Sequence, residues 1–314
     1  HEGDINYKPY EFTVDSKKLF FLTDEESEFR YLKSYDLETG EFETVETADW
    51  DISYSYLSWH NRYRVTAINN DARTEMHVYD IVTGEKVEFP VMPEGVITSV
   101  GISKSENLMR FYVNGSRSPS DLYVYDFRTG DYRKLTDSMN PEIDKRDLVD
   151  AEVVRYRSTD DLEIPAIYYK PHGAEEGEKI PALIWVHGGP GGQARVWYSS
   201  FIQYIVNHGY AVLAVNNRGS SGYGKSFYKL DDRKHGEGDL DDCVMAKEFL
   251  ATTGYVDRDR IGIAGGSYGG YMVLAALAFR PEEFAVGVDM FGVSNWVRTL
   301  ESIPPWWESF RRAL

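Results

Sequence analysis

A serine between two glycines is the part of the sequence whose residue types and spacing could do chemistry. Gly265, Ser267 and Gly269 stand in the pattern G-x-S-x-G, which is typical of a nucleophile elbow, a tight turn between a strand and a helix. In that turn the serine hydroxyl stands clear of the sheet, and the first amides of the helix point at the same spot. The pattern predicts Ser267 as the nucleophile of an acyl transfer, with the N–H of Tyr268 as an oxyanion donor. Because so short a pattern recurs by chance, the surrounding elements must support it.

A second glycine-rich segment spans residues 187–192 and begins with His187 and Gly188. It follows an apolar run, so we expect it at the carboxyl end of a buried strand. Its bare backbone could bring another N–H donor to the oxyanion. His187 precedes Ser267, whereas the order in this kind of sheet is Ser, then Asp or Glu, then His, so we favour a loop-supporting role over that of general base. The alternative of a phosphate loop would need Gly-Lys-Ser/Thr, which is missing.

A third cluster, residues 216–224, also follows an apolar run and contains Arg218. Open sheets bind their ligands at the carboxyl ends of the strands, where we expect this cluster to lie. Arg218 is predicted to brace the loop through backbone carbonyls or a carboxylate. Contact with substrate is the alternative role.

Strands alternating with helices would position these three segments. The predicted strands are 151–157, 164–169, 182–187, 210–215, 261–264 and 284–290, and the predicted helices are 201–208, 239–252 and 271–279. This alternation predicts a doubly wound, mostly parallel sheet over residues 151–314. A charged stretch after Asn140-Pro141 predicts a linker at 141–150. In this setting Ser267 has the strand before it and the helix after it that an elbow requires.

A repeat organises the first 140 residues. Tyr35, Tyr79 and Tyr125 each begin a Tyr-Asp-x-x-Thr-Gly segment, and these segments are 44 and 46 residues apart. Each segment is a hairpin-turn signal, and the period is that of β-propeller blades. We expect a partial β-propeller of about three blades over residues 1–140, although a closed propeller needs roughly four to eight. A simple antiparallel sandwich is the alternative. The predicted strands are 10–14, 19–22, 31–37 and 42–45, then 52–59, 63–68, 76–81 and 86–89, then 96–102, 108–113, 122–127 and 132–135.

The composition excludes several classes of partner. A net charge of −17 argues against nucleic acid and anionic membranes as partners. The sequence contains no run of 18 apolar residues of the kind that spans a bilayer. The single cysteine, Cys243, rules out an internal disulfide and fits a reducing compartment. We predict no metal and no cofactor, because neither a ligand cluster nor a cofactor loop is seen at the required spacing.

The repeat and the motifs at 187–190, 217–224 and 265–271 together resemble the prolyl oligopeptidase family of serine peptidases, on its acylaminoacyl-peptidase side. The resemblance covers nearly the whole chain. It implies a cytoplasmic serine peptidase that hydrolyses short peptides, with an α/β-hydrolase domain and a propeller that keeps folded proteins from the site. Homo-oligomerisation is left open.

Carried over by position, the family's functional residues fall on a few places in this chain. The resemblance implies that the N–H groups of Gly189 and Tyr268 form the oxyanion hole. It also implies that Val293 and Trp296 form an apolar wall of the primary specificity pocket, with core packing as the equally weighted alternative for Trp296. The dipeptidyl-peptidase branch uses a tyrosine side chain at the position of His187, and this chain lacks that tyrosine.

The segment after Ser267 departs from the family pattern. All seven histidines precede Ser267, and Asp289 is the only aspartate after it. We therefore expect an incomplete fragment that lacks the triad Asp and His, needs a further C-terminal segment to complete the site, and is nearly inactive alone. A carboxylesterase on the same fold and a non-catalytic propeller binding module are the alternative functions.

Overall fold

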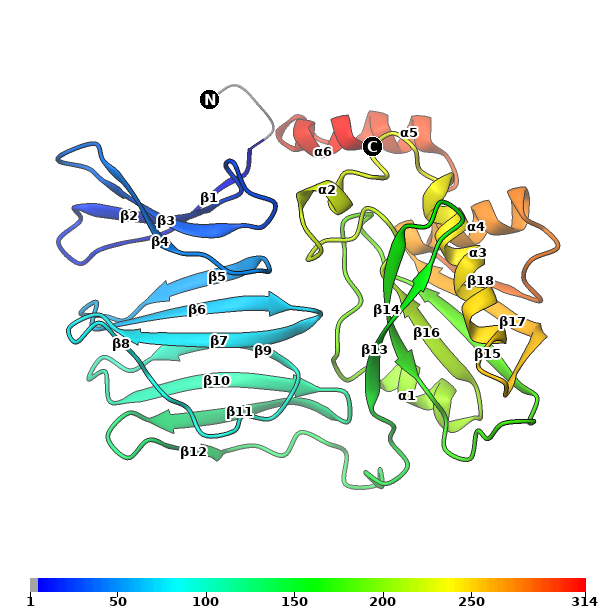
Figure 1. Ribbon diagram of the computed structural model, residues 1–314, viewed down its shortest axis with the longest axis horizontal. Coiled ribbons are helices and arrows are strands. Elements are labelled where there is room, and N and C mark those ends of the chain that lie inside the picture. The colour runs from blue at the N-terminus through cyan, green and yellow to red at the C-terminus, as the bar shows by residue number, and fades with distance from the viewer. Residues whose placement is uncertain (1–4) are drawn as a thin grey trace. The chain divides into compact units, whose positions relative to one another are not determined.

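The computed structural model describes residues 5–314, except for the side chains of residues 309 and 310. Residues 1–4 of the predicted propeller segment lie outside the described residues. The chain divides into two compact units: the first comprises residues up to Ile143 with 196–198 and 222–225, and the second comprises the remainder (Figure 1). None of the described helices is long and apolar enough to cross a membrane.

The first unit contains three four-stranded antiparallel sheets in which strand order follows the chain. The strands are β1 (Tyr7–Phe12), β2 (Lys18–Thr23), β3 (Tyr31–Asp36) and β4 (Phe42–Glu46); β5 (Ile52–Leu57), β6 (Tyr63–Asn70), β7 (Arg73–Asp80) and β8 (Glu85–Lys86); β9 (Val96–Ile102), β10 (Leu108–Gly115), β11 (Ser118–Asp126) and β12 (Asp131–Lys134). The predicted propeller blades are confirmed, each with its four strands.

The repeated segments form the same turn in each sheet. After β3, the Asp36 carboxylate accepts hydrogen bonds from the N–H groups of Glu38 and Thr39, both at 2.9 Å. Gly40 closes the turn with φ of +75° and donates its N–H to the Asp36 carbonyl. The aspartate satisfies the backbone of the turn and glycine tolerates the left-handed conformation, which is why this short pattern recurs with the period of the blades.

Strand β7 begins earlier than the predicted strand 76–81. Asn70 pairs with Arg73 across a two-residue turn in which Asp71 and Ala72 have φ of +45° and +68°. Positive φ at both central residues matches the right-handed twist of the flanking strands. The turn lacks the usual Asn-Gly or Asp-Gly signal, so the sequence pattern missed it.

The second unit is built on one six-stranded sheet with the order β13-β14-β16-β15-β17-β18. Its strands are β13 (Ala151–Arg157), β14 (Glu163–Tyr169), β15 (Ile180–Val186), β16 (Ala211–Val215), β17 (Val256–Gly266) and β18 (Gly287–Met290). Three neighbouring pairs are parallel, and the two pairs made by β14 are antiparallel. The predicted mostly parallel sheet is therefore a mixed sheet whose parallel part carries the glycine-rich segments.

Helices cover both faces of this sheet. Ile184 and Val186 of β15 share a buried cluster with residues of α3 (Gly238–Ala251) and α4 (Tyr268–Phe279). Trp185, between them in sequence, packs instead on Phe201 of α1 (Ser200–Asn207), with ring centroids 5.3 Å apart. Because side chains alternate across a strand, α1 lies on the face opposite α3 and α4.

Several short helices were not predicted from the sequence. They are α2 (Lys225–Tyr228), α5 (Trp296–Ser302), the 3-10 turn η1 (Pro305–Trp307) and α6 (Glu308–Ala313). The nucleophile helix α4 also begins at Tyr268 rather than at the predicted Tyr271. Its first turn contains two glycines, whose low helix propensity hides it from a sequence pattern.

Candidate active site

Ser267 occupies a strained turn between β17 and α4. Its φ and ψ are 57° and −118°, a conformation that non-glycine residues rarely adopt. The backbone is fixed on both sides, because Ser267 N–H donates to the Met290 carbonyl at 3.1 Å and the Ser267 carbonyl accepts from Tyr271 N–H at 3.0 Å. The Ser267 residue is exposed, while Tyr268 is buried. The turn thus presents a serine side chain at the surface and sends the next side chain into the core.

The two flanking glycines lie where backbones cross at close range. A Cβ atom on Gly265 would lie 2.7 Å from the Val186 carbonyl oxygen and 2.6 Å from the Gly269 carbonyl carbon. A Cβ atom on Gly269 would lie 2.1 Å from the same Val186 oxygen. The spacing G-x-S-x-G therefore follows from the contact of α4 with the end of β15.

The glycine-rich segment 187–192 lies against the serine. A Cβ atom on Gly188 would be 3.4 Å from the Ser267 Cβ and 3.4 Å from the Gly266 carbonyl oxygen, so the segment passes close to the turn that holds the serine. Gly189 adopts φ of +141°, and a Cβ atom there would be 2.6 Å or less from the amide nitrogens of Gly191 and Gly192. Only glycine fits this path, and the path brings the loop that contains Gly189 to the nucleophile.

His187 is engaged by neighbouring loops through both ring nitrogens. Nδ1 lies 2.8 Å from the Gly188 carbonyl oxygen, and Nε2 lies 2.8 Å from the Ser220 hydroxyl. Burial lowers the pKa of His187, so the ring is neutral near pH 7. This geometry connects the segment 187–192 to the part of the loop after β16 that contains Ser220.

Arg218, in the loop after β16, pairs with one buried and one exposed carboxylate. Its Nε and Nη2 donate to the Asp242 carboxylate at 2.9–3.2 Å, and its two terminal nitrogens donate to Asp160 at 2.9 and 3.0 Å. Asp242 is fully buried in α3 and also accepts from the Arg218 N–H and the Ser158 hydroxyl. Of the two predicted kinds of partner, carboxylates rather than backbone carbonyls bind the guanidinium.

Trp296 is the first residue of α5, and Asn295 caps that helix by accepting from the Arg298 N–H at 3.0 Å. The Trp296 ring lies against the Tyr268 ring, with centroids 6.3 Å apart, and contacts the Tyr271 ring edge-on at 5.0 Å. Val293 is partly buried in the segment between β18 and α5. The tryptophan implied as a pocket wall is thus packed on the residue that follows the nucleophile.

Asp289, the only aspartate after Ser267, caps a turn. It lies in β18, and its Oδ1 accepts a hydrogen bond from the Gly292 N–H at 2.8 Å. A Cβ atom on Gly270 would be 2.3 Å from the same oxygen. The carboxylate therefore fixes the chain beside the first turn of α4.

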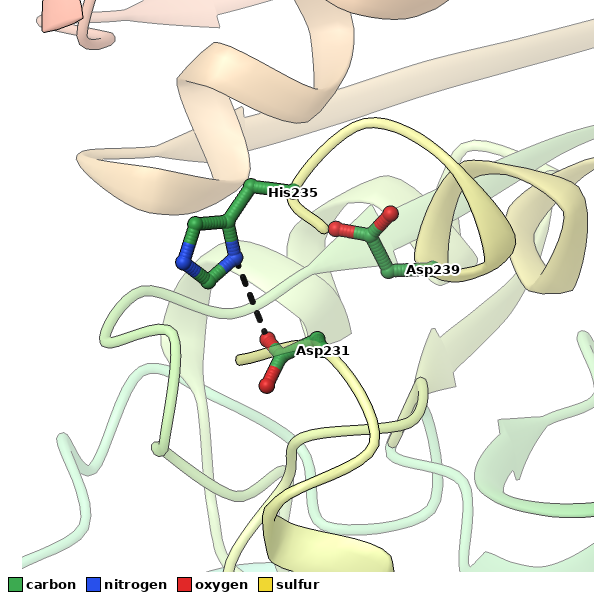
Figure 2. A group of neighbouring side chains, drawn as sticks. All are labelled: Asp231, His235 and Asp239. Atoms are coloured by element: carbon green, nitrogen blue, oxygen red, sulfur yellow. Dashed lines mark ion pairs between the residues drawn. The ribbon is translucent and has the colours of Figure 1, made fainter. Parts of the chain in front are cut away.

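A cluster that the sequence analysis missed lies beside Tyr268. Asp231, His235 and Asp239 have ligand-type atoms within 4.8 Å of one another, and Figure 2 shows their side chains converging. The signal in the sequence is a histidine with acidic residues four positions before and after it. The three could supply ligands to a metal ion, but the Tyr268 hydroxyl already bonds two of them, His235 and Asp239.

Comparisons with known proteins agree with the fold and the motifs. Residues 196–313 match the model of the prolyl oligopeptidase family. The dipeptidyl aminopeptidase BIII of Pseudoxanthomonas mexicana is 31% identical over 98% of this chain and 46% of its own length. The dipeptidyl peptidase family member 6 of Caenorhabditis elegans is 33% identical over 71% of this chain and 33% of its own length.

A solved structure of a puromycin-hydrolysing peptidase from Mycobacterium tuberculosis superimposes with a TM-score of 0.85 and 22% identity, over 98% of this chain and 47% of that one. The chain thus spans about half the length, or less, of these relatives. With the family match, the sequence identity and the shared fold in agreement, the chain belongs to the prolyl oligopeptidase family.

Proposed function

We propose that the protein containing these residues is a serine peptidase that hydrolyses short peptides through an acyl-enzyme on Ser267. The observation that carries the proposal is the strained, exposed Ser267 with the glycine-rich segment at Gly188 passing close to it. Strain at a single exposed nucleophile is a feature of active sites, where it holds the reacting atom in place. Family membership supports the same reaction class.

In this reaction the Ser267 Oγ attacks the scissile carbonyl carbon, and the leaving amine departs with a proton. The N–H groups of Tyr268 and Gly189 would stabilise the negative charge on the carbonyl oxygen. A histidine must accept the serine proton, and in this fold it follows the nucleophile in sequence. All seven histidines precede Ser267, so we propose that the base lies in sequence outside these 314 residues.

The substrate class is a short peptide. One relative is named as a dipeptidyl aminopeptidase and another as a dipeptidyl peptidase family member, so release of a dipeptide from a free amino terminus is the first activity to assay. The acylaminoacyl-peptidase alternative predicts that an acetylated peptide is cleaved faster than the same peptide with a free amine. Matched peptides that differ only in this group decide between the two.

The test of the proposed nucleophile uses a fluorophosphonate probe on the full-length protein. We expect stoichiometric labelling, and we expect Ser267→Ala to abolish labelling and to lower peptide hydrolysis by at least about 10³-fold. Ser302→Ala, at an exposed serine in α5, serves as the control and should retain both. Labelling that persists in Ser267→Ala would remove Ser267 from this role.

A further inference from the structure

The cluster beside Tyr268 is buried and short of partners. Asp231 and Asp239 are 3% and 0% exposed, and the His235 side chain is 5% exposed. In the described part of the chain, Asp231 Oδ2 and His235 Nε2 are buried without a hydrogen-bond partner. Buried polar atoms of this kind are rare in folded proteins and call for an explanation.

The hydrogen bonds of Tyr268 indicate which ring nitrogen of His235 carries the proton. The Tyr268 hydroxyl donates its one proton to Asp239 Oδ2, and the pKa of Tyr268 is raised far above its usual value by burial and by the Asp239 charge. The Tyr268 oxygen can therefore only accept from His235 Nδ1, which lies 2.9 Å away. Since the phenol has no second proton, His235 Nδ1 must carry one, and Nε2 is the nitrogen left without a partner.

Neighbouring groups hold both ends of this hydrogen-bonded chain. Asp231 Oδ2 lies 3.5 Å from the same His235 Nδ1, on the side that Figure 2 shows facing the carboxylates. A Cβ atom on Gly219 would be 2.1 Å from the Asp231 carboxyl carbon, so the Asp231 carboxylate packs directly on the backbone of Gly219, the residue after Arg218. Asp239 Oδ1 accepts the N–H groups of Gly236 and Leu240 at 2.8 and 2.9 Å.

The Trp296 ring packs on the imidazole ring of His235. The His235 and Trp296 rings stack with centroids 5.4 Å apart and 18° between planes. The His235 ring meets Tyr268 edge-on at 5.3 Å. Tyr271 adds a third support, because its hydroxyl donates to the His235 carbonyl at 2.8 Å and its ring contacts Trp296.

We propose that His235 is a positioning residue of the active site, which holds Trp296 in register with Tyr268. This inference rests on the proposed function. The Nδ1–H bond fixes the plane of the imidazole, and that plane sets the tilt of the tryptophan implied as a pocket wall. His235 therefore governs which substrate side chains are accepted beside the scissile bond, without touching the reacting atoms.

Two substitutions separate the ring from the hydrogen bond. His235→Phe keeps a flat ring for Trp296 and loses the donor to Tyr268, while His235→Asn keeps a donor near the Nδ1 position and loses the ring. We expect each to lower, by about tenfold, the kcat/KM ratio between peptides with a large apolar and a small side chain at the scissile residue. Fluorophosphonate labelling of Ser267 should stay within about twofold, because the probe does not need the pocket wall. His208→Phe, at an exposed histidine after α1, is the control and should leave the ratio unchanged.

A spectroscopic measurement tests the arrangement independently of activity. In the ¹⁵N-histidine-labelled full-length protein, His235 should carry its proton on Nδ1, and Tyr268→Phe should shift the Nδ1–H resonance, because the phenol oxygen that accepts this hydrogen bond is lost. If His235 carries its proton only on Nε2, or if both substitutions leave the side-chain ratio unchanged in folded protein, the proposal is wrong. Stoichiometric Zn²⁺ binding that is lost in Asp231→Asn would also overturn it, because the cluster would then be a metal site. If Ser267→Ala retains labelling, the proposed function fails, and the tautomer still reports on His235.

Discussion

The Arg218 guanidinium binds the fully buried carboxylate of Asp242, so that α3 is clamped to the loop after β16. This loop also carries Ser220, which lies 2.8 Å from His187 Nε2. The ion pair therefore stabilises the loop that stands behind the glycine-rich segment next to Ser267. Its removal should affect both stability and the site.

We predict that Arg218→Ala lowers the free energy of unfolding by about 3–5 kcal/mol, because it leaves an uncompensated charge at Asp242. Urea denaturation measures the change. Arg146→Ala is the matched control: Arg146 pairs with Asp144 on the surface, with side-chain exposures of 89% and 41%, and solvent screens that pair. The urea midpoint of the control should not move. An equal effect of both substitutions would contradict the clamp.

A side chain at Gly269 should disrupt the elbow. We predict that Gly269→Ala costs at least about 3 kcal/mol, because the new Cβ must displace the Val186 carbonyl, which it approaches to 2.1 Å. Gly209→Ala is the control, since Gly209 has φ of +85° with no atom within 4 Å of an added Cβ; it should cost only about 1 kcal/mol for the left-handed conformation. Thermal and urea unfolding compare the two, and a tolerated alanine at Gly269 would show that the crossing is looser than described.

The strain at Ser267 can be measured as stability. Ser267→Gly should be more stable than Ser267→Ala by about 1 kcal/mol, because glycine adopts φ of 57° and ψ of −118° without a Cβ penalty. Alanine keeps the Cβ and so keeps the strain, which makes it the matched comparison for a protein that has lost the hydroxyl in either case. Equal urea midpoints would mean that the turn stores no strain.

The second blade should become less stable as pH rises. The Glu46 hydrogen bond raises the pKa of His77, whose ring nitrogens lie 2.7 and 2.8 Å from the Glu46 and Glu75 carboxylates. Because the folded pKa exceeds the unfolded value of about 6.5, the stabilisation is complete below that value and is lost as pH rises through the folded pKa. Burial raises the pKa of Glu46, but the hydrogen bond from His77 and the other polar partners together outweigh burial, and the pKa is lowered. The stabilisation by the Glu46–His77 pair is therefore also lost in strong acid, when Glu46 is protonated.

The measurement is the melting temperature of wild type and His77→Gln between pH 5 and 9 in overlapping buffers. The penalty of the substitution should be largest near pH 5–6 and should shrink towards pH 9. His172→Gln, at an exposed histidine in a turn, should show no such trend. A penalty that does not vary with pH would mean that His77 acts through packing alone.

Three features could be predicted from the sequence: the blades, the alternation of strands and helices, and the place of Ser267 between a strand and a helix. These features are local: turn residues recur at a fixed period, apolar runs mark buried strands, and G-x-S-x-G reflects a backbone crossing that only glycine allows. The start of β7 and the first turn of α4 were not predicted, because residues with a low propensity for a hairpin turn or a helix occupy them. Strand pairing and helix packing override that low propensity.

Contacts between side chains that are far apart in the sequence could not be predicted from local patterns. Asp160 and Asp242 come together on Arg218 from positions 58 and 24 residues away. His235, Tyr268 and Trp296 come into ring contact from three separate segments of the chain. Such contacts depend on how the sheet and helices pack in three dimensions, and a pattern along the chain carries no record of that packing. The serine can thus be found from its neighbours in sequence, whereas the residues that support it can be found only from its neighbours in space.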